Sequence, residues 1–234
     1  MEQKIDKRIN YILNIDTETC NTIETEKGLD MSNVLVYDIG YQVIDKKGNV
    51  YEQGSFVISD IFLDEKKLMR SAYYCDKIPN YWEDIKSGQR ILKSWFNVRK
   101  IILEVIKKYD IHVITAYNAR FDSNALNTTM RYITKSEIRY YFPRSCKLVW
   151  WDTLKMARDT IIKQKTYKQF CIENNFLTKN GRLKATAEVV YRYISNDINF
   201  EEHHTGLEDV IIETKILAKC FAQHKKMRKL LWEN

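Results

Sequence analysis

Residues 9–18 read INYILNIDTE, and this stretch decides the fold that the sequence predicts. The run from Ile9 to Ile15 is rich in isoleucine, as β-strands are. Asp16 and Glu18 follow at the end of this strand, and side chains two residues apart in a strand point to one face, about 6.6 Å apart along the chain. We therefore expect two carboxylates that can meet on one side of a sheet. Solvated acids at a strand end are the alternative, because so short a pattern is common by chance.

Two more strands are expected early in the chain. Val34 to Ile44 and Val50 to Ile58 are rich in valine, isoleucine and tyrosine, and the segment Lys46-Lys47-Gly48-Asn49 between them is a turn signal. We expect these two strands and the run from Ile9 to Ile15 to pair antiparallel. The fold is therefore expected to open with three antiparallel strands.

Strands and helices alternate in the rest of the chain. Apolar residues recur at helical spacing from Ile91 to Ile106, from Phe121 to Ile133, from Leu154 to Ile162 and from Leu207 to Phe221, whereas Ile111 to Ala116 and Leu148 to Trp151 are typical of strands. We predict an α/β fold with a mixed β-sheet, in which three antiparallel strands are followed by parallel strands, flanked by α-helices.

The composition predicts a single domain. The chain has 234 residues with only two prolines and seven glycines, and no stretch has the composition of a flexible linker. We expect one domain over residues 1–234, with a basic helical tail from about residue 222. That tail contains the basic run His224 to Lys229, which could follow a phosphate backbone, although a charge run at a helix end is usually solvated.

Charge, cysteine content and hydropathy narrow the class of protein. The net charge of +7 favours a polyanionic partner such as nucleic acid. The five cysteines are scattered without a C-x-x-C pair, which argues against a disulfide framework or a zinc site. No apolar run has the length of a membrane span or of a signal-peptide core. A soluble, cytoplasmic protein with no membrane partner is expected.

A third acid, Asp122, lies where a strand gives way to a helix. It ends the segment Asn118-Ala119-Arg120-Phe121-Asp122, and a carboxylate at a helix start gains from the helix dipole. The carboxyl ends of strands are also where open α/β sheets bind ligands. Asp122 is thus either a site residue or an ordinary helix cap. Phe121 suits the core by position, but its ring can also lie beside a site.

The segment His203-His204-Thr205-Gly206-Leu207-Glu208-Asp209 is the sharpest signal. Thr205 and Glu208 form the T-x-x-E of a capping box before an apolar run, so Thr205 is the expected N-cap and Glu208 its partner. His204 and Asp209 then occupy the two positions that a hydrophobic staple brings into contact. A titratable pair where apolar residues are preferred indicates function, the alternative being a surface histidine beside a solvated acid. His203 is the weaker candidate because it lies one residue further out.

Taken in order, three of these segments resemble the motifs of a known family. The segments Asp16-Thr17-Glu18-Thr19, Asn118 to Asp122 and His204 to Asp209 are similar to the three motifs of the DEDDh group of DnaQ-like 3′-to-5′ exonucleases, which have an RNase H-like fold. Trp151 to Arg158 resembles the strand-to-helix segment that follows the second motif. The resemblance runs from about residue 9 to residue 222. Two departures are Cys20-Asn21, where many members have Thr-Gly, and Gly206, where alanine is common.

The resemblance implies a phosphodiester hydrolase that uses two divalent metal ions. Asp16, Glu18, Asp122 and Asp209 would hold the metals, and His204 would be the general base that takes a proton from water. Carboxylate oxygens without thiolates select hard cations, so Mg²⁺ or Mn²⁺ is expected. Residues at the terminal nucleotide would be Thr17, Thr19, Asn118 and Phe121. The product would be a nucleoside 5′-monophosphate.

The expected partners are 3′ ends of single-stranded DNA or RNA, with DNA slightly favoured, and a DNA polymerase or another replication or repair protein. The alternative function is a catalytically silent module that binds nucleic acid or a polymerase. Two aromatic pairs, Tyr73-Tyr74 and Tyr81-Trp82, lie in a stretch expected to be irregular. They could stack on bases, although packing is the more common role of such residues.

Overall fold

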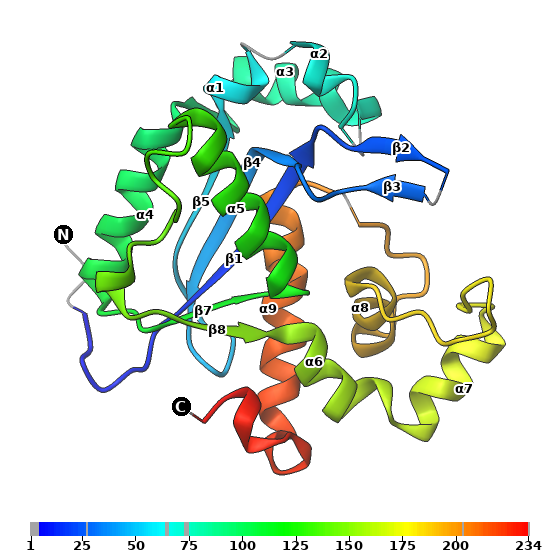
Figure 1. The fold of residues 1–234 in the computed structure, drawn as a ribbon. Helices are drawn as coiled ribbons and strands as arrows, with labels where there is room; N and C mark the ends of the chain where they lie inside the picture. Colours follow the sequence, from blue (N-terminus) through cyan, green and yellow to red (C-terminus); the bar gives the residue numbers. More distant parts are fainter. Residues whose placement is uncertain (1–4, 27, 64–65, 73–74, 203, 234) are drawn as a thin grey trace.

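A six-stranded mixed sheet forms the centre of the molecule in the computed structural model, which describes residues 5–233 except 27, 64–65, 73–74 and 203 (Figure 1). The strand order is β6-β5-β4-β1-β7-β8. The strands are β1 (Ile12–Cys20), β4 (Leu35–Ile44), β5 (Val50–Ile58), β6 (Ile91–Lys93), β7 (Val113–Ala116) and β8 (Val149–Asp152). β4 is antiparallel to both β1 and β5, whereas β7, β8 and β6 each add in parallel. A separate hairpin pairs β2 (Ile23–Thr25) with β3 (Gly28–Asp30).

Helices make up most of the remaining structure. They are α1 (Ser59–Phe62), α2 (Lys66–Met69), α3 (Ile78–Ser87), α4 (Trp95–Tyr109), α5 (Ala119–Ile133), α6 (Thr153–Ala157), α7 (Lys165–Glu173), α8 (Ala187–Ser195) and α9 (Gly206–Ala222). Short 3₁₀ turns span Cys75–Lys77, Arg144–Cys146, His224–Lys226 and Lys229–Leu231, and a π-helical turn spans Arg158–Ile162. In the described part of the chain, none of these helices has the length and hydropathy to cross a bilayer.

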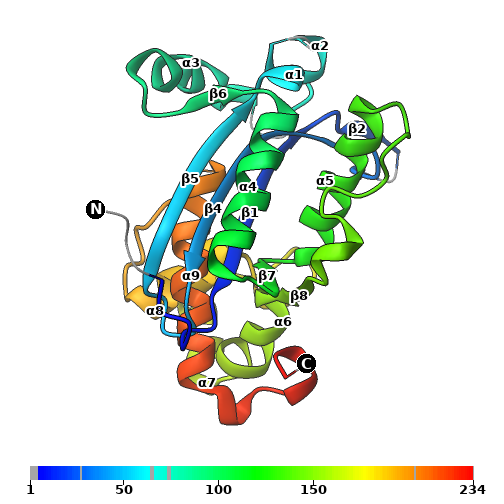
Figure 2. The ribbon, with the colours of Figure 1, turned by 90° about the vertical axis from the view of Figure 1, so that its left-hand side faces the viewer.

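The two faces of the sheet are covered by different helices. Figure 2 shows α4 and α5 on one side of β1 and β4, with α9 on the other. Because side chains alternate along a strand, Leu13 and Ile15 of β1 pack into the core under α4 and α5, whereas Ile12 packs with α6 to α9. The mixed α/β class predicted from the sequence is confirmed, with helices on both faces.

A buried polar ladder joins α9 to the sheet. The Asn14 side chain donates to Thr214 Oγ1 at 3.0 Å, and the Thr214 hydroxyl donates to Gln42 Oε1 at 2.9 Å. All three residues are buried, so each unmade bond would leave an unsatisfied polar group in the core. A slide or rotation of α9 would break this ladder, which therefore fixes the register of the helix against β1 and β4.

The first residue of α9 touches the sheet backbone directly. A Cβ atom on Gly40 of β4 would lie 2.0 Å from the carbonyl carbon of Gly206, and one on Gly206 would lie 2.5 Å from the amide nitrogen of Gly40. Neither position has room for a side chain. Gly40 also pairs with Asp16 across the β1–β4 ladder, so this contact places the start of α9 beside Asp16. It gives a physical reason for glycine at position 206, where the resembling family often has alanine.

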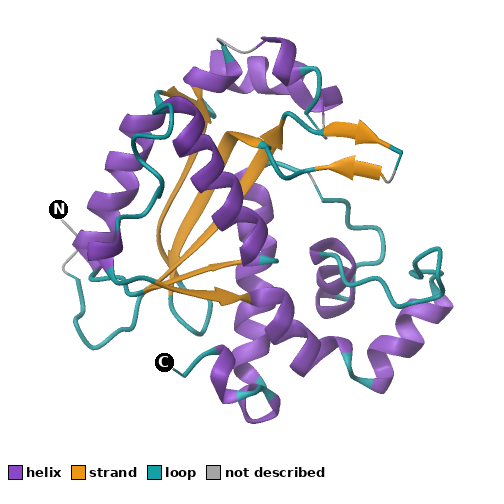
Figure 3. Cartoon of the chain, viewed as in Figure 1, coloured by secondary structure: helices purple, strands orange, loops and turns teal. Residues whose placement is uncertain are grey.

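The structure corrects three expectations about secondary structure. β1 continues to Cys20, so Asp16 and Glu18 lie inside the strand rather than at its end; β4 stays paired with this half through a register shift after Glu18. Residues 91–93 form β6 instead of the first turn of a helix, because they pair with the end of β5. Helices α1 to α3 replace the irregular stretch expected after β5 (Figure 3).

We predict that Gly40→Ala lowers the free energy of unfolding by about 3 kcal/mol, because the added methyl group meets backbone atoms that no side-chain rotation can move. Urea unfolding monitored by circular dichroism measures this. Val50→Ala, at an exposed position on the neighbouring strand, should change stability by only about 0.5 kcal/mol. A Gly40→Ala protein as stable as the Val50→Ala protein would contradict the close contact.

Candidate active site

Three acids from two elements share one small volume. Asp16 and Glu18 come from β1 and Asp209 from the first turn of α9, and their carboxylate oxygens lie within 4.8 Å of one another. Glu18 and Asp209 are buried and Asp16 is partly buried. The structure therefore brings together three of the four acids that the sequence singled out, although they lie almost two hundred residues apart in the chain.

The fourth acid, Asp122, is joined to β1 through a threonine. It lies buried in the first turn of α5, and its Oδ1 accepts a 2.9 Å hydrogen bond from the Thr17 hydroxyl. Among the described residues it falls outside the 4.8 Å groups of acids and histidines. It still lies close enough for the charge of Asp16 to act on it.

His204 does lie beside Asp209, as the capping register predicts. The two residues form a second group within 4.8 Å, and its third member is Glu202, whose Oε2 lies 3.7 Å from His204 Nδ1. Sequence analysis did not identify Glu202 as a site residue, although its position two residues before His204 could have indicated that it lies near the site. His203, the weaker candidate, lies outside the described residues.

The start of α9 is capped differently from the capping-box prediction. Thr205 is the N-cap residue, as predicted, but its hydroxyl donates to the Glu208 carboxylate and makes no bond to the helix backbone. The N–H of Gly206 instead donates to Asp38 Oδ2 at 3.1 Å. Asp38 thus satisfies one of the backbone N–H groups at the helix start, through a charge-assisted bond that is stronger than a neutral one. Asp38 was not identified from the sequence.

The predicted nucleotide-binding residues lie on β1 and at the start of α5, the elements that carry Asp16, Glu18 and Asp122. Thr17 and Thr19 are buried on β1, and Thr17 is engaged with Asp122. Asn118 is exposed at the start of α5, with a left-handed φ of 68°, and Phe121 is partly buried against the core under α4 and α5.

Of the two aromatic pairs, the one that the structure describes, Tyr81-Trp82, is less suited to base stacking than the sequence analysis allowed. Tyr81 is only 1% exposed and its hydroxyl donates to Asp38, so it is a core residue. Trp82 is 39% exposed and stays a candidate surface residue. Tyr73 and Tyr74 lie outside the described residues.

Burial and mutual repulsion make these carboxyl groups hard to ionise. Burial, and then the charge of Asp38, raises the pKa of Asp16 to about 7. Burial, and then the charges of Asp16 and Glu202, raises the pKa of Asp209 to about 11. Glu202 is raised to about 8, again by burial first and Asp16 second. The pKa values of Glu18 and Asp122 are also raised, with burial as the main cause.

The donor set fits a hard divalent cation. Asp209 Oδ1 is buried without a hydrogen-bond partner, and so is Oε2 of Glu213, one helical turn further along α9. Unpaired carboxylate oxygens cost free energy in a buried site, and a cation with a preference for oxygen ligands removes that cost. The residues present therefore suit Mg²⁺ or Mn²⁺ better than a metal that requires thiolates.

Comparison with solved structures shows which fold this is. A full-length 3′-exonuclease matches with a TM-score of 0.57 and 12% identity, over 94% of this chain and 85% of that one. The nuclease domain of 3′hExo, a DEDDh family member bound to rAMP, matches with a TM-score of 0.51 and 11% identity, over 95% and 97%. E. coli Exonuclease I, in complex with an oligonucleotide, matches with 0.52 and 14%, over 93% of this chain and 41% of that one.

The chain thus has the fold of DEDDh-type 3′-exonucleases, and the RNase H-like architecture expected from the resemblance is confirmed. No protein-family model and no curated protein sequence matches it. At sequence identities this low, the structural similarity establishes the fold alone.

We predict that the metal-free protein loses stability as pH rises from about 4 to about 8. Unfolded carboxyl groups ionise near 3.8 for aspartate and 4.5 for glutamate, whereas folded Asp16 and Glu202 retain protons up to about 7 and 8. The folded state binds more protons throughout this window, so ionisation favours unfolding. Urea unfolding in the presence of a chelator, at a series of pH values, measures the trend.

Asp209→Asn should flatten this pH dependence and raise the stability of the metal-free protein by roughly 1–2 kcal/mol near the upper end of the window, because folded Asp209 keeps its proton up to a pKa of about 11 while the unfolded chain ionises it near 3.8, and asparagine has no proton to keep. Asp110→Asn is the matched control, since Asp110 is 92% exposed at the end of α4. A metal-free wild type that gains stability over the same range would show that the acids do not repel one another in the folded state.

Proposed function

We propose that this protein is a metal-dependent 3′-to-5′ exonuclease that hydrolyses nucleic acid from its 3′ end and releases nucleoside 5′-monophosphates. The observation that carries the proposal is the convergence of buried carboxylates from β1 and α9 within 4.8 Å, beside a histidine, in the fold of 3′-exonucleases. The net charge of +7 supports a polyanionic substrate.

Asp16, Glu18, Asp122 and Asp209 are the residues that would hold two divalent cations, Mg²⁺ or Mn²⁺. When bound, such ions polarise the phosphodiester and lower the pKa of water. The protein contributes a preorganised set of oxygen ligands on rigid elements. The hydrogen bond from Thr17 fixes Asp122, and the close contact of α9 with β4 at Gly206 fixes Asp209.

His204 is the proposed general base. It lies within reach of Asp209 and precedes the rigid first turn of α9, so its position is set by the same contacts that place Asp209. Its imidazole would accept a proton from the attacking water, and Glu202, 3.7 Å from Nδ1, would favour the protonated ring that results.

The proposed substrate is the 3′ end of a single strand, with DNA slightly favoured over RNA. Thr17, Thr19, Asn118 and Phe121 would line the pocket of the terminal nucleotide. Among the structural neighbours, Exonuclease I is seen with a DNA oligonucleotide and 3′hExo with rAMP, so the fold is found with either sugar. A polymerase or another replication or repair partner stays a prediction.

We predict that Asp16→Asn and excess chelator each abolish release of mononucleotides, because both remove the cation-binding set. The assay compares matched DNA and RNA oligonucleotides, labelled in turn at the 3′ and the 5′ end, with Mg²⁺ or Mn²⁺. Asp110→Asn removes an exposed acid and should retain full activity. If the Asp16→Asn protein cleaved the oligonucleotides at the wild-type rate, the proposed mechanism would be wrong. Binding of metal and oligonucleotide by the wild type without turnover would favour the silent binding module.

We predict that His204→Ala lowers the turnover rate by roughly a hundredfold or more, as is typical for loss of a general base, and leaves Mn²⁺ affinity nearly unchanged. Single-turnover rates over a range of pH, together with Mn²⁺ titration calorimetry, separate the two effects. His112→Ala, at the opposite end of β1 beside β7, is the control. An unchanged rate across the pH profile would exclude His204 as the base.

A further inference from the structure

A single buried carboxylate connects three segments next to the candidate active site. Asp38 on β4 is fully buried, and its Oδ2 accepts hydrogen bonds from the Tyr81 hydroxyl at 2.7 Å, from Arg90 Nη1 at 3.3 Å and from the Gly206 N–H at 3.1 Å. These donors belong to α3, to the segment before β6 and to the first residue of α9. Asp38 also pairs with Glu18 across the β1–β4 ladder.

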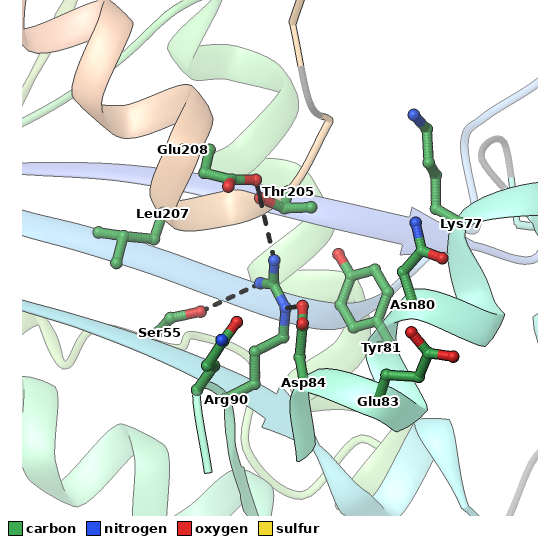
Figure 4. Close-up of a pocket in the computed structure, with 11 residues that line it drawn as sticks. Ser55, Lys77, Asn80, Tyr81, Glu83, Asp84, Arg90, Thr205, Leu207 and Glu208 are labelled. Atoms are coloured by element: carbon green, nitrogen blue, oxygen red, sulfur yellow. Dashed lines mark hydrogen bonds and ion pairs between the residues drawn. The ribbon is translucent and has the colours of Figure 1, made fainter. Parts of the chain in front are cut away.

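Arg90 holds this carboxylate from the other side. Its side chain is only 9% exposed, and Nε donates to Asp84 at 2.8 Å while the guanidinium lies 4.6 Å from the centre of the Tyr81 ring. Figure 4 shows Arg90 between α3 and the start of α9, with Asp84 on one side and Glu208 on the other. The buried charges of Arg90 and Asp38 need these partners, because a buried charge without them strongly destabilises the folded protein.

The start of α9 depends on this arrangement. The Thr205 side chain makes no bond to the helix backbone, and the Gly206 N–H is bonded to Asp38 instead. The residues on either side of this bond are His204 and, in the first turn, Asp209. A carboxylate at a helix N-terminus is also favoured by the helix dipole.

We propose that Asp38, held by Arg90 and Tyr81, is a positioning residue that fixes the first turn of α9 and thereby sets Asp209 and His204 against Asp16 and Glu18. This inference rests on the proposed nuclease function. Asp38 acts through the helix start and has no contact with substrate in this role. It links the helices inserted after β5 to the geometry of the site.

The direct test is Asp38→Asn, which keeps the shape and an acceptor oxygen but removes the charge that Arg90 pairs with. We expect faster amide hydrogen exchange in residues 206–209, Mn²⁺ affinity reduced about tenfold and turnover reduced tenfold to a hundredfold, because a small misplacement of site residues is costly. Asp159→Asn is the matched control: it also removes a carboxylate that accepts from an arginine, Arg228, but neither residue bonds to Asp38 or Arg90, and it should match the wild type in all three readouts.

Two further variants keep the test decisive. Tyr81→Phe removes only one donor to Asp38, and we expect a smaller change in the same direction at the start of α9. Arg90→Gln strands the buried carboxylate, so adding Asp38→Asn to it should recover stability without recovering turnover. A folded Asp38→Asn protein with wild-type exchange in residues 206–209, or Tyr81→Phe without any change there, would overturn the proposal, as would a loss of stability alone with wild-type turnover.

Hydrogen exchange and Mn²⁺ affinity do not depend on a nuclease assay. If the wild type released no mononucleotides, the proposed function would fail while these two readouts still decided the role of Asp38. If the wild type is active and Asp38→Asn matches it, only the positioning role fails.

Discussion

Repulsion among buried carboxylates is the constraint on which the rest of this structure depends. Glu18, Asp122 and Asp209 lie buried around Asp16, where the low dielectric makes like charges repel strongly. In the part of the chain that the structure describes, no lysine or arginine forms an ion pair with any of the four. Arg90, a mostly buried cation beside the start of α9, is committed to Asp38 and Asp84. Such a site favours either protons or divalent cations.

Packing elsewhere supplies the free energy that holds these acids together. The backbone contact between Gly40 and Gly206 brings α9 against β4, and the ladder through Asn14 and Thr214 fixes its register. Large apolar clusters on both faces of the sheet make the platform rigid. A rigid platform keeps the acids close when they would otherwise separate, so binding of a cation needs little reorganisation.

The sequence predicted the parts of the site whose signals are local. Strand β5 has the predicted bounds, and the capping register correctly placed His204 near Asp209, because both features depend on neighbouring residues. The role of Asp38 could not be predicted in this way: its partners lie up to 168 residues away. Strand β6 was missed because three residues are too few to show a period of two, and Ile91 and Leu92 fit the helical spacing that follows.

The most direct test of the central claim is the anomalous scattering of manganese in crystals of the wild-type protein grown with Mn²⁺. The account predicts two strong anomalous peaks among the carboxylates of Asp16, Glu18, Asp122 and Asp209, and their loss in Asp16→Asn. Ordered carboxylates without anomalous density between them, or manganese bound only at other positions, would contradict it.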